Sequence, residues 1–313
     1  MPADGPSGGP LVVAVVGPTA SGKSDLALRL AETVGGEVVG ADAMQLYRGM
    51  DIGTAKLSLA ERRGIPHHQV DVLDVTDEAT IARYQVEARA SIDDVRGRDL
   101  HPVVAGGSGL YVRAAVDHLD IPPTDPSVRA RLEDEAEQRG GDALYAVLSE
   151  RDPVAAQAIE PRNVRRVIRA LEVIEITGRP FSASMPERRH LHPTVTVGLR
   201  PPRALLDERI DLRVAQMWRD GLVDEVRGLV PRGLREGRTA SRALGYAQAL
   251  AEIDGTMSEA EAQAETAQLT RRYARRQESW FRPDPRITWF DPTVDGALDE
   301  AVAHVERAIT DNG

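Results

Sequence analysis

The residues that could most clearly do chemistry are the eight from Gly17 to Ser24, which read Gly-Pro-Thr-Ala-Ser-Gly-Lys-Ser. They fit the pattern of a glycine, four residues and Gly-Lys-Ser/Thr, whose backbone N–H groups bind phosphate. Lys23 would reach the terminal phosphate oxygens, Ser24 would ligate Mg²⁺, and the hydroxyls of Thr19 and Ser21 could add donors. The pattern predicts a site for a phosphate or diphosphate and leaves open whether that group belongs to ATP.

The segments on either side predict the elements that would hold this loop. Residues 11–16 form an apolar run typical of a buried parallel strand, and residues 24–31 have the spacing of a helix. A strand, a glycine loop and a helix in this order direct a helix N-terminus at a bound phosphate. Repeated β–α units predict an α/β fold, with a parallel sheet flanked by helices. The further expected elements are strands at 36–42, 68–73 and 101–106 and a helix at 81–95.

Asp42 stands at the carboxyl end of the second expected strand, the edge where open α/β sheets bind ligands. A carboxylate there could hold magnesium or accept a proton from a nucleophile. It could also close an Asx turn or cap a helix. Residues 43–56 follow without a clear period and are typical of a binding loop. The strand at 101–106 ends without the acid that ATP-hydrolysing enzymes commonly place there, which disfavours a motor or a switch.

The composition changes near a Pro-containing stretch at 119–126. Residues 127–178 have a charged, helical pattern, a strand pattern returns at 194–199, and the rest is mostly helical up to a last strand at 286–290. We therefore expect an all-helical domain inserted into the α/β core. The expected divisions are a disordered tail at 1–10, core at 11–120, the helical insertion at 121–190 and core again at 191–313.

Two groups of arginines favour an anionic partner. Arg162, Arg165, Arg166 and Arg169 are spaced i, i+3, i+4 and i+7, so we expect all four on one face of a helix, where like charges are unfavourable. The second group, within 271–276, stands beside aromatic residues, a mixture that suits phosphates and stacked bases. Either group could instead be an ordinary helix, solvated in the first case and packed through its aromatic residues in the second.

The composition limits the other classes of protein. The 313 residues include no cysteine, which excludes disulfides, thiolate zinc sites and a cysteine nucleophile and suits a reducing, cytoplasmic location. No segment has the features of a signal sequence or a membrane span, so no membrane partner is expected. The net charge of −10 argues weakly against nucleic acid, although binding needs only a local positive surface.

Six segments, taken in order, resemble the bacterial tRNA dimethylallyltransferases, also called tRNA isopentenyltransferases. The segments are residues 17–24, 41–56, 105–111, 163–173, 244–248 and 271–281. The resemblance implies a P-loop core with an inserted helical domain that together clasp the anticodon stem-loop of a tRNA, and we expect a monomer. It also implies transfer of a dimethylallyl group from dimethylallyl diphosphate to the N6 amine of the adenosine just 3′ of the anticodon, in tRNAs that read codons beginning with U. The base must be flipped out for its amine to be reached.

The resemblance also implies roles for individual residues. Asp42 corresponds to the general base of the family, Thr19 would lie near the amine and the diphosphate, and Lys23 would grip the diphosphate. Arg242 is the expected further clamp on the diphosphate. The expected diphosphate contacts are Gly17, Pro18, Thr19, Ala20, Ser21, Gly22, Lys23 and Ser24, with Ser24 also on Mg²⁺. The expected tRNA contacts are Asp42, Ala43, Met44, Gln45, Ser108, Arg129, Arg165, Arg166, Val167, Ile168 and Arg169.

Three other functions compete with this one. A small-molecule P-loop kinase would explain the loop and Asp42 but not the arginine groups. An isopentenyltransferase acting on free adenine nucleotides would share the chemistry, and the helical insertion and the arginines favour tRNA over it. A non-catalytic tRNA-binding protein would lose no activity when Asp42 is replaced.

Overall fold

The computed structural model describes residues 8–184 and 188–312. The chain divides into two compact units, residues 1–117 with 189–313, and residues 118–188. The second unit is the segment for which an insertion at 121–190 was expected. Most of the tail expected at 1–10 lies outside the described residues.

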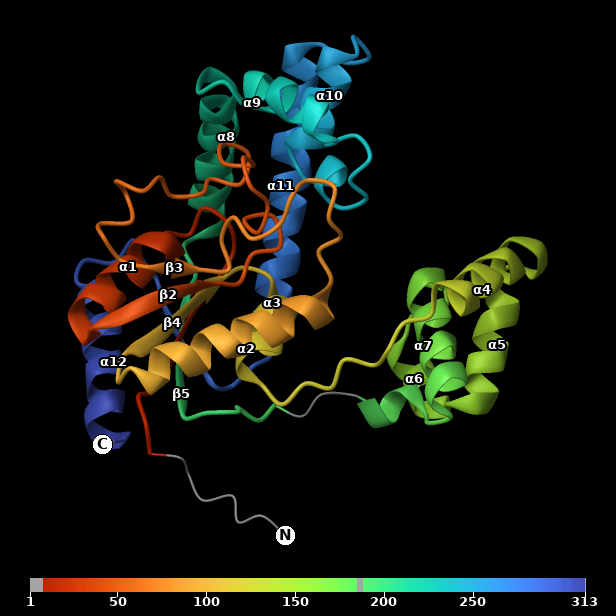
Figure 1. Cartoon of the computed structure of the whole chain (residues 1–313), viewed down its shortest axis with the longest axis horizontal. Helices are drawn as coiled ribbons and strands as arrows, with labels where there is room; N and C mark the ends of the chain where they lie inside the picture. The colour runs from red at the N-terminus through yellow and green to blue at the C-terminus, as the bar shows by residue number, and fades with distance from the viewer. Residues whose placement is uncertain (1–7, 185–187, 313) are drawn as a thin grey trace. The chain divides into compact units, whose positions relative to one another are not determined.

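The first unit is built on a six-stranded parallel sheet in the order β3-β2-β4-β1-β5-β6. Strands β2, β3, β4 and β5 are labelled in Figure 1. The run Val12–Val16 forms β1 and is buried along its whole length, because a central strand of a parallel sheet is covered on both faces. The remaining strands are β2 (Gly36–Gly40), β3 (His67–His68), β4 (His101–Gly106), β5 (Thr194–Leu199) and β6 (Ile287–Phe290).

Helices cover both faces of this sheet. Helix α1 (Lys23–Val34) connects β1 to β2, and helix α2 (Ile81–Gly97) connects β3 to β4. The two connections run in opposite directions along the sheet. Because such crossovers are right-handed, the two helices lie on opposite faces. Val13 and Val15 pack with α1 and with α12 (Ala297–Asn312) in one apolar core. Helix α3 (Gly109–Val116) packs beside α2. The expected strands at 11–16, 101–106, 194–199 and 286–290 and the helix at 81–95 are confirmed.

The strand expected at 68–73 is wrong beyond its first residue. Gln69 and Asp71 have φ of +58° and +59°, left-handed backbone that cannot continue a ladder. Strand β3 therefore ends at His68, and the chain between β2 and α2 is mostly loop. Lys56 anchors this loop, because its buried Nζ donates to the Tyr47 carbonyl at 2.7 Å and to the Asp71 carboxylate at 2.6 Å.

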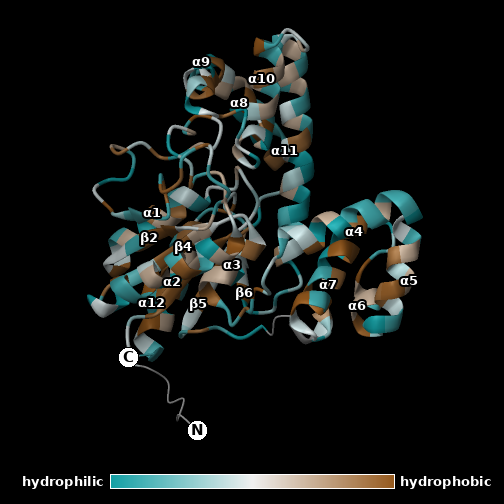
Figure 2. Ribbon diagram, turned by 45° about the vertical axis from the view of Figure 1, so that its right-hand side comes forward, coloured by the Kyte–Doolittle hydropathy of each residue, from teal (hydrophilic) through white to brown (hydrophobic). Residues whose placement is uncertain are grey.

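The second unit is a small helical bundle with its own apolar core. Asp125 and Asp152 each precede a proline and accept hydrogen bonds from backbone N–H groups at the start of the next helix, as their Asp-Pro sequences predict. Apolar residues from its helices, brown in Figure 2, form this core. Its helices are α4 (Pro126–Arg139), α5 (Gly141–Arg151), α6 (Pro153–Ala158) and α7 (Val164–Thr177), followed by a short 3-10 helix at Phe181–Ser184.

The chain between β5 and β6 is helical and belongs to the first unit. Its longest helix, α11 (Glu259–Phe281), packs along α8 (Arg203–Arg219) and begins at a capping box, in which Ser258 and Glu261 each bond the other's backbone N–H. No described helix is long and apolar enough to cross a membrane. The other helices here are α9 (Leu222–Leu229), α10 (Tyr246–Ile253) and 3-10 turns at Val230–Arg232 and Ala240–Arg242.

Candidate active site

Glycines occupy two positions of the loop after β1 where a side chain would be strained. Gly17 has φ +143°, and a Cβ there would come within 2.5 Å of the Leu199 carbonyl oxygen. Gly22 caps α1 with φ +94°, so Lys23 and Ser24 become the first residues of the helix. The buried hydroxyl of Ser21 has no hydrogen-bond partner. An unpaired buried donor and a helix N-terminus together suit a phosphate group.

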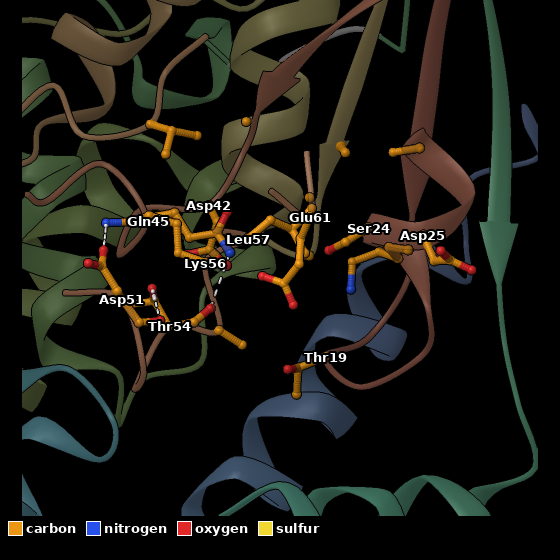
Figure 3. Close-up of a pocket in the computed structure, with 18 of the residues that line it drawn as sticks. Thr19, Ser24, Asp25, Asp42, Gln45, Asp51, Thr54, Lys56, Leu57 and Glu61 are labelled. Carbon is orange, nitrogen blue, oxygen red and sulfur yellow. Dashed lines mark hydrogen bonds and ion pairs between the residues drawn. The ribbon is translucent and has the colours of Figure 1, made fainter. Parts of the chain in front are cut away.

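This loop opens into a pocket of about 840 Å³ at the carboxyl edge of the sheet. Figure 3 shows Thr19 and Ser24 on one side of the pocket, with Asp42, Gln45 and Lys56 on the other. Thr19, Ala20, Gly22, Lys23 and Ser24 of the loop line it. Gly17, Pro18 and Ser21 belong to the same loop but do not line the pocket. The pocket is larger than a small diphosphate needs, so there is room for a second reactant.

Asp42 lies two residues beyond the end of β2, and its side chain lines the pocket. Its Oδ1 accepts a hydrogen bond from the Met44 N–H at 2.9 Å, which forms an Asx turn. The turn does not prevent Asp42 from meeting a substrate, because it uses only one carboxylate oxygen and fixes the direction of the side chain. Asp42 can therefore meet a substrate in a defined orientation.

The positive charges of the pocket act on one another. Lys23 donates from Nζ to the Pro18 carbonyl at 2.6 Å. Burial lowers the pKa of Lys23 to about 8, Asp42 opposes that shift and Arg213 adds to it. Burial also lowers the pKa of Arg213, and Asp42 opposes this too. Two cations held together in a half-buried pocket favour the binding of an anion.

The pocket contains Arg213, whereas Arg242 is the arginine expected from the sequence to clamp the diphosphate. Arg242 ends a 3-10 turn, is exposed and does not line the pocket, so nothing in the pocket supports its expected role as a clamp. Arg213 lines the pocket from α8 together with Gln216, Met217 and Asp220. These residues follow the spacing i, i+3, i+4 and i+7, which could have marked this face of α8 as one surface, though not as part of the site.

Two more lining residues, Tyr273 and Gln277, come from the arginine-rich segment of α11. Gln277 accepts a hydrogen bond from the Thr19 N–H. Burial, and then the negative charge of Asp42, raise the pKa of Tyr273 to about 12. Arg276 lies over the Tyr273 ring, at 5.9 Å from its centroid. This segment therefore forms part of the pocket wall. The sequence alone had left open whether it contacts RNA or packs through its aromatic residues.

The expected tRNA contacts of the first unit lie at or beside the pocket. Ala43, Met44 and Gln45 are partly exposed, and Gln45 donates from Nε2 to the Thr54 carbonyl at 3.1 Å. Ser108 precedes α3 as its N-cap residue, and its side chain makes no capping hydrogen bond. The adjacent Gly106 and Gly107 line the pocket.

Two of the expected tRNA contacts in the second unit have partners within that unit. Arg129 and Arg169 both donate to the fully buried Glu172, at 2.7 and 2.8 Å, and Arg169 also donates to the carbonyls of Pro122 and Pro123. Glu172 is buried, which raises its pKa, but these arginines outweigh that and leave the pKa below its usual value. A buried carboxylate held this way needs its cations, so both arginines support the bundle.

The arginine face is also smaller than its spacing predicts. Arg162 precedes α7 and is not part of it. Val167 and Ile168 are buried in the core of the bundle, so their side chains do not offer a surface to tRNA. Arg165 and Arg166 are exposed on α7, whereas Arg169 on the same helix is only partly exposed.

The comparisons with known proteins agree with one another. Residues 45–284 match the model of the IPP transferase family, and residues 10–71 match that of isopentenyl transferase. The tRNA dimethylallyltransferase of Kineococcus radiotolerans is 63% identical, over 91% of this chain and 92% of its own length, and that of Streptomyces coelicolor is 57% identical, over 96% and 97%.

Solved structures give the same result. The tRNA isopentenylpyrophosphate transferase of Bacillus halodurans is 38% identical with a TM-score of 0.72, covering 96% of this chain and 97% of that one. A eukaryotic dimethylallyltransferase acting on tRNA is 27% identical with a TM-score of 0.82, covering 96% and 80%. The chain therefore belongs to the IPP transferase family, among relatives named tRNA dimethylallyltransferase.

Proposed function

We propose that this protein transfers a dimethylallyl group from dimethylallyl diphosphate to an adenosine of tRNA and releases diphosphate. The observation that carries the proposal is one pocket whose lining includes the phosphate loop with Lys23, the Arg213 guanidinium and the Asp42 carboxylate from the loop after β2. The loop and cations suit a diphosphate leaving group, and the carboxylate suits an acceptor that must lose a proton. The names of close relatives point to the same reaction.

At the donor end, the allylic C–O bond breaks and negative charge grows on the departing diphosphate. Lys23, Arg213 and the N–H groups at the start of α1 stabilise that charge. Among the described residues no three His, Asp or Glu side chains form a metal cluster. Mg²⁺ would be held by the Ser24 hydroxyl together with oxygens of the diphosphate, as is usual for this ion, and would supply further charge neutralisation.

At the acceptor end, the N6 amine of adenine forms a C–N bond with the allylic carbon and must give up a proton. The amine is a weak nucleophile because its lone pair is delocalised into the ring. Asp42 takes the proton as the bond forms, a contribution of about 10²–10⁴-fold for a positioned base. Because the Asx turn with Met44 already fixes the Asp42 side chain, its second oxygen is oriented before the substrate binds.

The tRNA would reach this pocket through flipping of the target base. We propose the adenosine 3′ of the anticodon as that base, in tRNAs reading codons that begin with U. The exposed Arg165 and Arg166, and the exposed Arg272, Arg275 and Arg276 of α11, are the candidate phosphate contacts. We also propose that the protein acts as a monomer in the cytoplasm.

The test is mass spectrometry of unmodified tRNA incubated with the protein, Mg²⁺ and dimethylallyl diphosphate. The expected result is one dimethylallyl group on one adenosine, with release of diphosphate. A parallel incubation with adenosine monophosphate in place of tRNA separates this activity from that of an enzyme modifying free nucleotides. Turnover of ATP with a small acceptor, with no modification of tRNA, would favour a kinase instead.

A further inference from the structure

The side chain of Gln277 links helix α11 to the phosphate loop. Its Oε1 accepts a hydrogen bond from the Thr19 N–H at 2.8 Å, between residues 258 positions apart in the sequence. Gln277 is only 5% exposed and lines the same pocket as Lys23 and Asp42. A buried amide keeps its place because leaving its polar atoms unpaired would be unfavourable. The loop is therefore held by a residue that does not belong to it.

Thr19 immediately precedes the most constrained position of the loop. Ala20 has φ of +62°, a left-handed conformation that residues with a side chain rarely adopt. Such backbone persists only where its surroundings hold it, and the bond to Gln277 is a restraint at the neighbouring peptide. The Thr19 N–H is already used, so the N–H groups available to a diphosphate are those from Ala20 onward.

The other end of the amide fixes which way it points. Gln277 Nε2 lies against Gly107, where an added Cβ would come within 2.1 Å of it, so the loop after β4 leaves space for this side chain. Packed against Gly107, the amide has little room to rotate, and its oxygen stays directed at the Thr19 N–H.

We propose that Gln277 is a positioning residue for the transfer reaction, which holds the phosphate loop in its diphosphate-binding shape from helix α11. This inference rests on the proposed function. Gln277 acts through the backbone of Thr19 and not on the reacting atoms. Its loss is expected to weaken the hold on diphosphate while leaving the fold and the binding of tRNA in place.

The experiment measures binding of inorganic diphosphate with Mg²⁺ by calorimetry, and transfer to tRNA by steady-state kinetics, on the full chain. Gln277→Ala should weaken diphosphate binding by about tenfold, as expected for one lost buried hydrogen bond. It should also raise KM for dimethylallyl diphosphate more than it lowers kcat. The matched control is Gln268→Ala, an exposed glutamine on the same helix, which should behave as wild type. Both variants should melt near the wild-type temperature.

A second variant separates positioning from a purely structural role. In Gln277→Glu the ionised carboxylate keeps the bond to Thr19 but puts a negative charge beside the diphosphate, whereas the protonated acid has a donor and an acceptor, like the amide. Its diphosphate affinity relative to wild type should therefore recover as the pH falls. Wild-type affinity in both Gln277 variants, or a pH-independent ratio with a lowered melting temperature, would overturn the inference. A wild-type protein that fails to bind diphosphate would contradict the proposed function instead.

Discussion

Arg213 and Asp42 act on each other across the pocket: burial lowers the pKa of the Arg213 guanidinium, and the negative charge of Asp42 opposes this. The two side chains come from α8 and from the loop after β2. In the proposed reaction the cation acts on the leaving group and the carboxylate on the acceptor.

Replacing Asp42 by Asn should abolish transfer while leaving tRNA binding nearly unchanged. Asn keeps an oxygen that can accept from the Met44 N–H, so the Asx turn survives and only the base is lost. The expected loss in kcat is about 10²–10⁴-fold. Single-turnover transfer and a tRNA binding assay measure the two effects. Near-normal turnover in this variant would remove Asp42 from the role of base.

Arg213→Ala should lower kcat/KM for dimethylallyl diphosphate by about 10²–10³-fold, as expected when a stabilising donor is removed from a leaving group. The matched control is Arg242→Ala, which removes an exposed arginine that does not line the pocket and should leave the activity unchanged. If the two variants exchange their effects, the protein binds its donor through a different arrangement of α8.

Diphosphate binding should weaken as the pH rises through about 8, the pKa to which burial lowers Lys23 in the free protein. An anion binds the protonated amine, so the free protein must first take up a proton above that pH, and affinity falls until the pKa of the complex is reached. Diphosphate itself titrates, so the measurement is the ratio of wild type to Lys23→Gln at each pH. A ratio that does not change between pH 7 and pH 9 would contradict this charge state.

The double replacement of Arg165 and Arg166 by Ala should weaken tRNA binding and reduce the slope of log K against log salt by about one to two units. Arg169→Ala is the contrasting variant, because it removes a partner of the buried Glu172. This variant should lower the melting temperature of the helical unit and leave the slope of log K against log salt unchanged. An unchanged slope in the double variant would place the phosphate contacts elsewhere.

Asp117→Asn should lower the free energy of unfolding by about 3–5 kcal/mol, since it leaves buried cations without their counter-charge. The fully buried Asp117 carboxylate accepts hydrogen bonds from Arg113, Arg286 and His190 at 2.8 to 3.0 Å. Burial raises its pKa, but these partners outweigh burial and hold the pKa well below the usual range.

The sign of the pH effect at Asp117 follows from this lowered pKa. The stabilisation is fully present above the pKa of the unfolded chain and is lost as the pH falls toward the folded value. Denaturant titrations of wild type and Asp117→Asn should therefore differ most near neutral pH and converge in acid. A constant difference would indicate that Asp117 contributes through packing.

The sequence by itself determined the elements and the loop chemistry. The apolar run at 12–16, the left-handed Gly22 and the Asp-Pro pairs act through local sterics and hydrogen bonding, which operate between neighbours in the chain. The motif segments were sufficient to indicate the family. The strand expected at 68–73 failed because tertiary contacts hold Gln69 and Asp71 in left-handed backbone that no local pattern marks.

Only the tertiary structure decided which charges serve the site. Arg213 and Arg242 look alike in sequence, and packing of α8 puts the first in the pocket and leaves the second outside. Arg129 and Arg169 look like surface charges until Glu172 is seen buried beside them. Local pattern sets which residues share a helix, whereas burial and long-range contacts set the electrostatic environment of each one. The latter depends on residues far away in the chain, and no spacing rule carries that information.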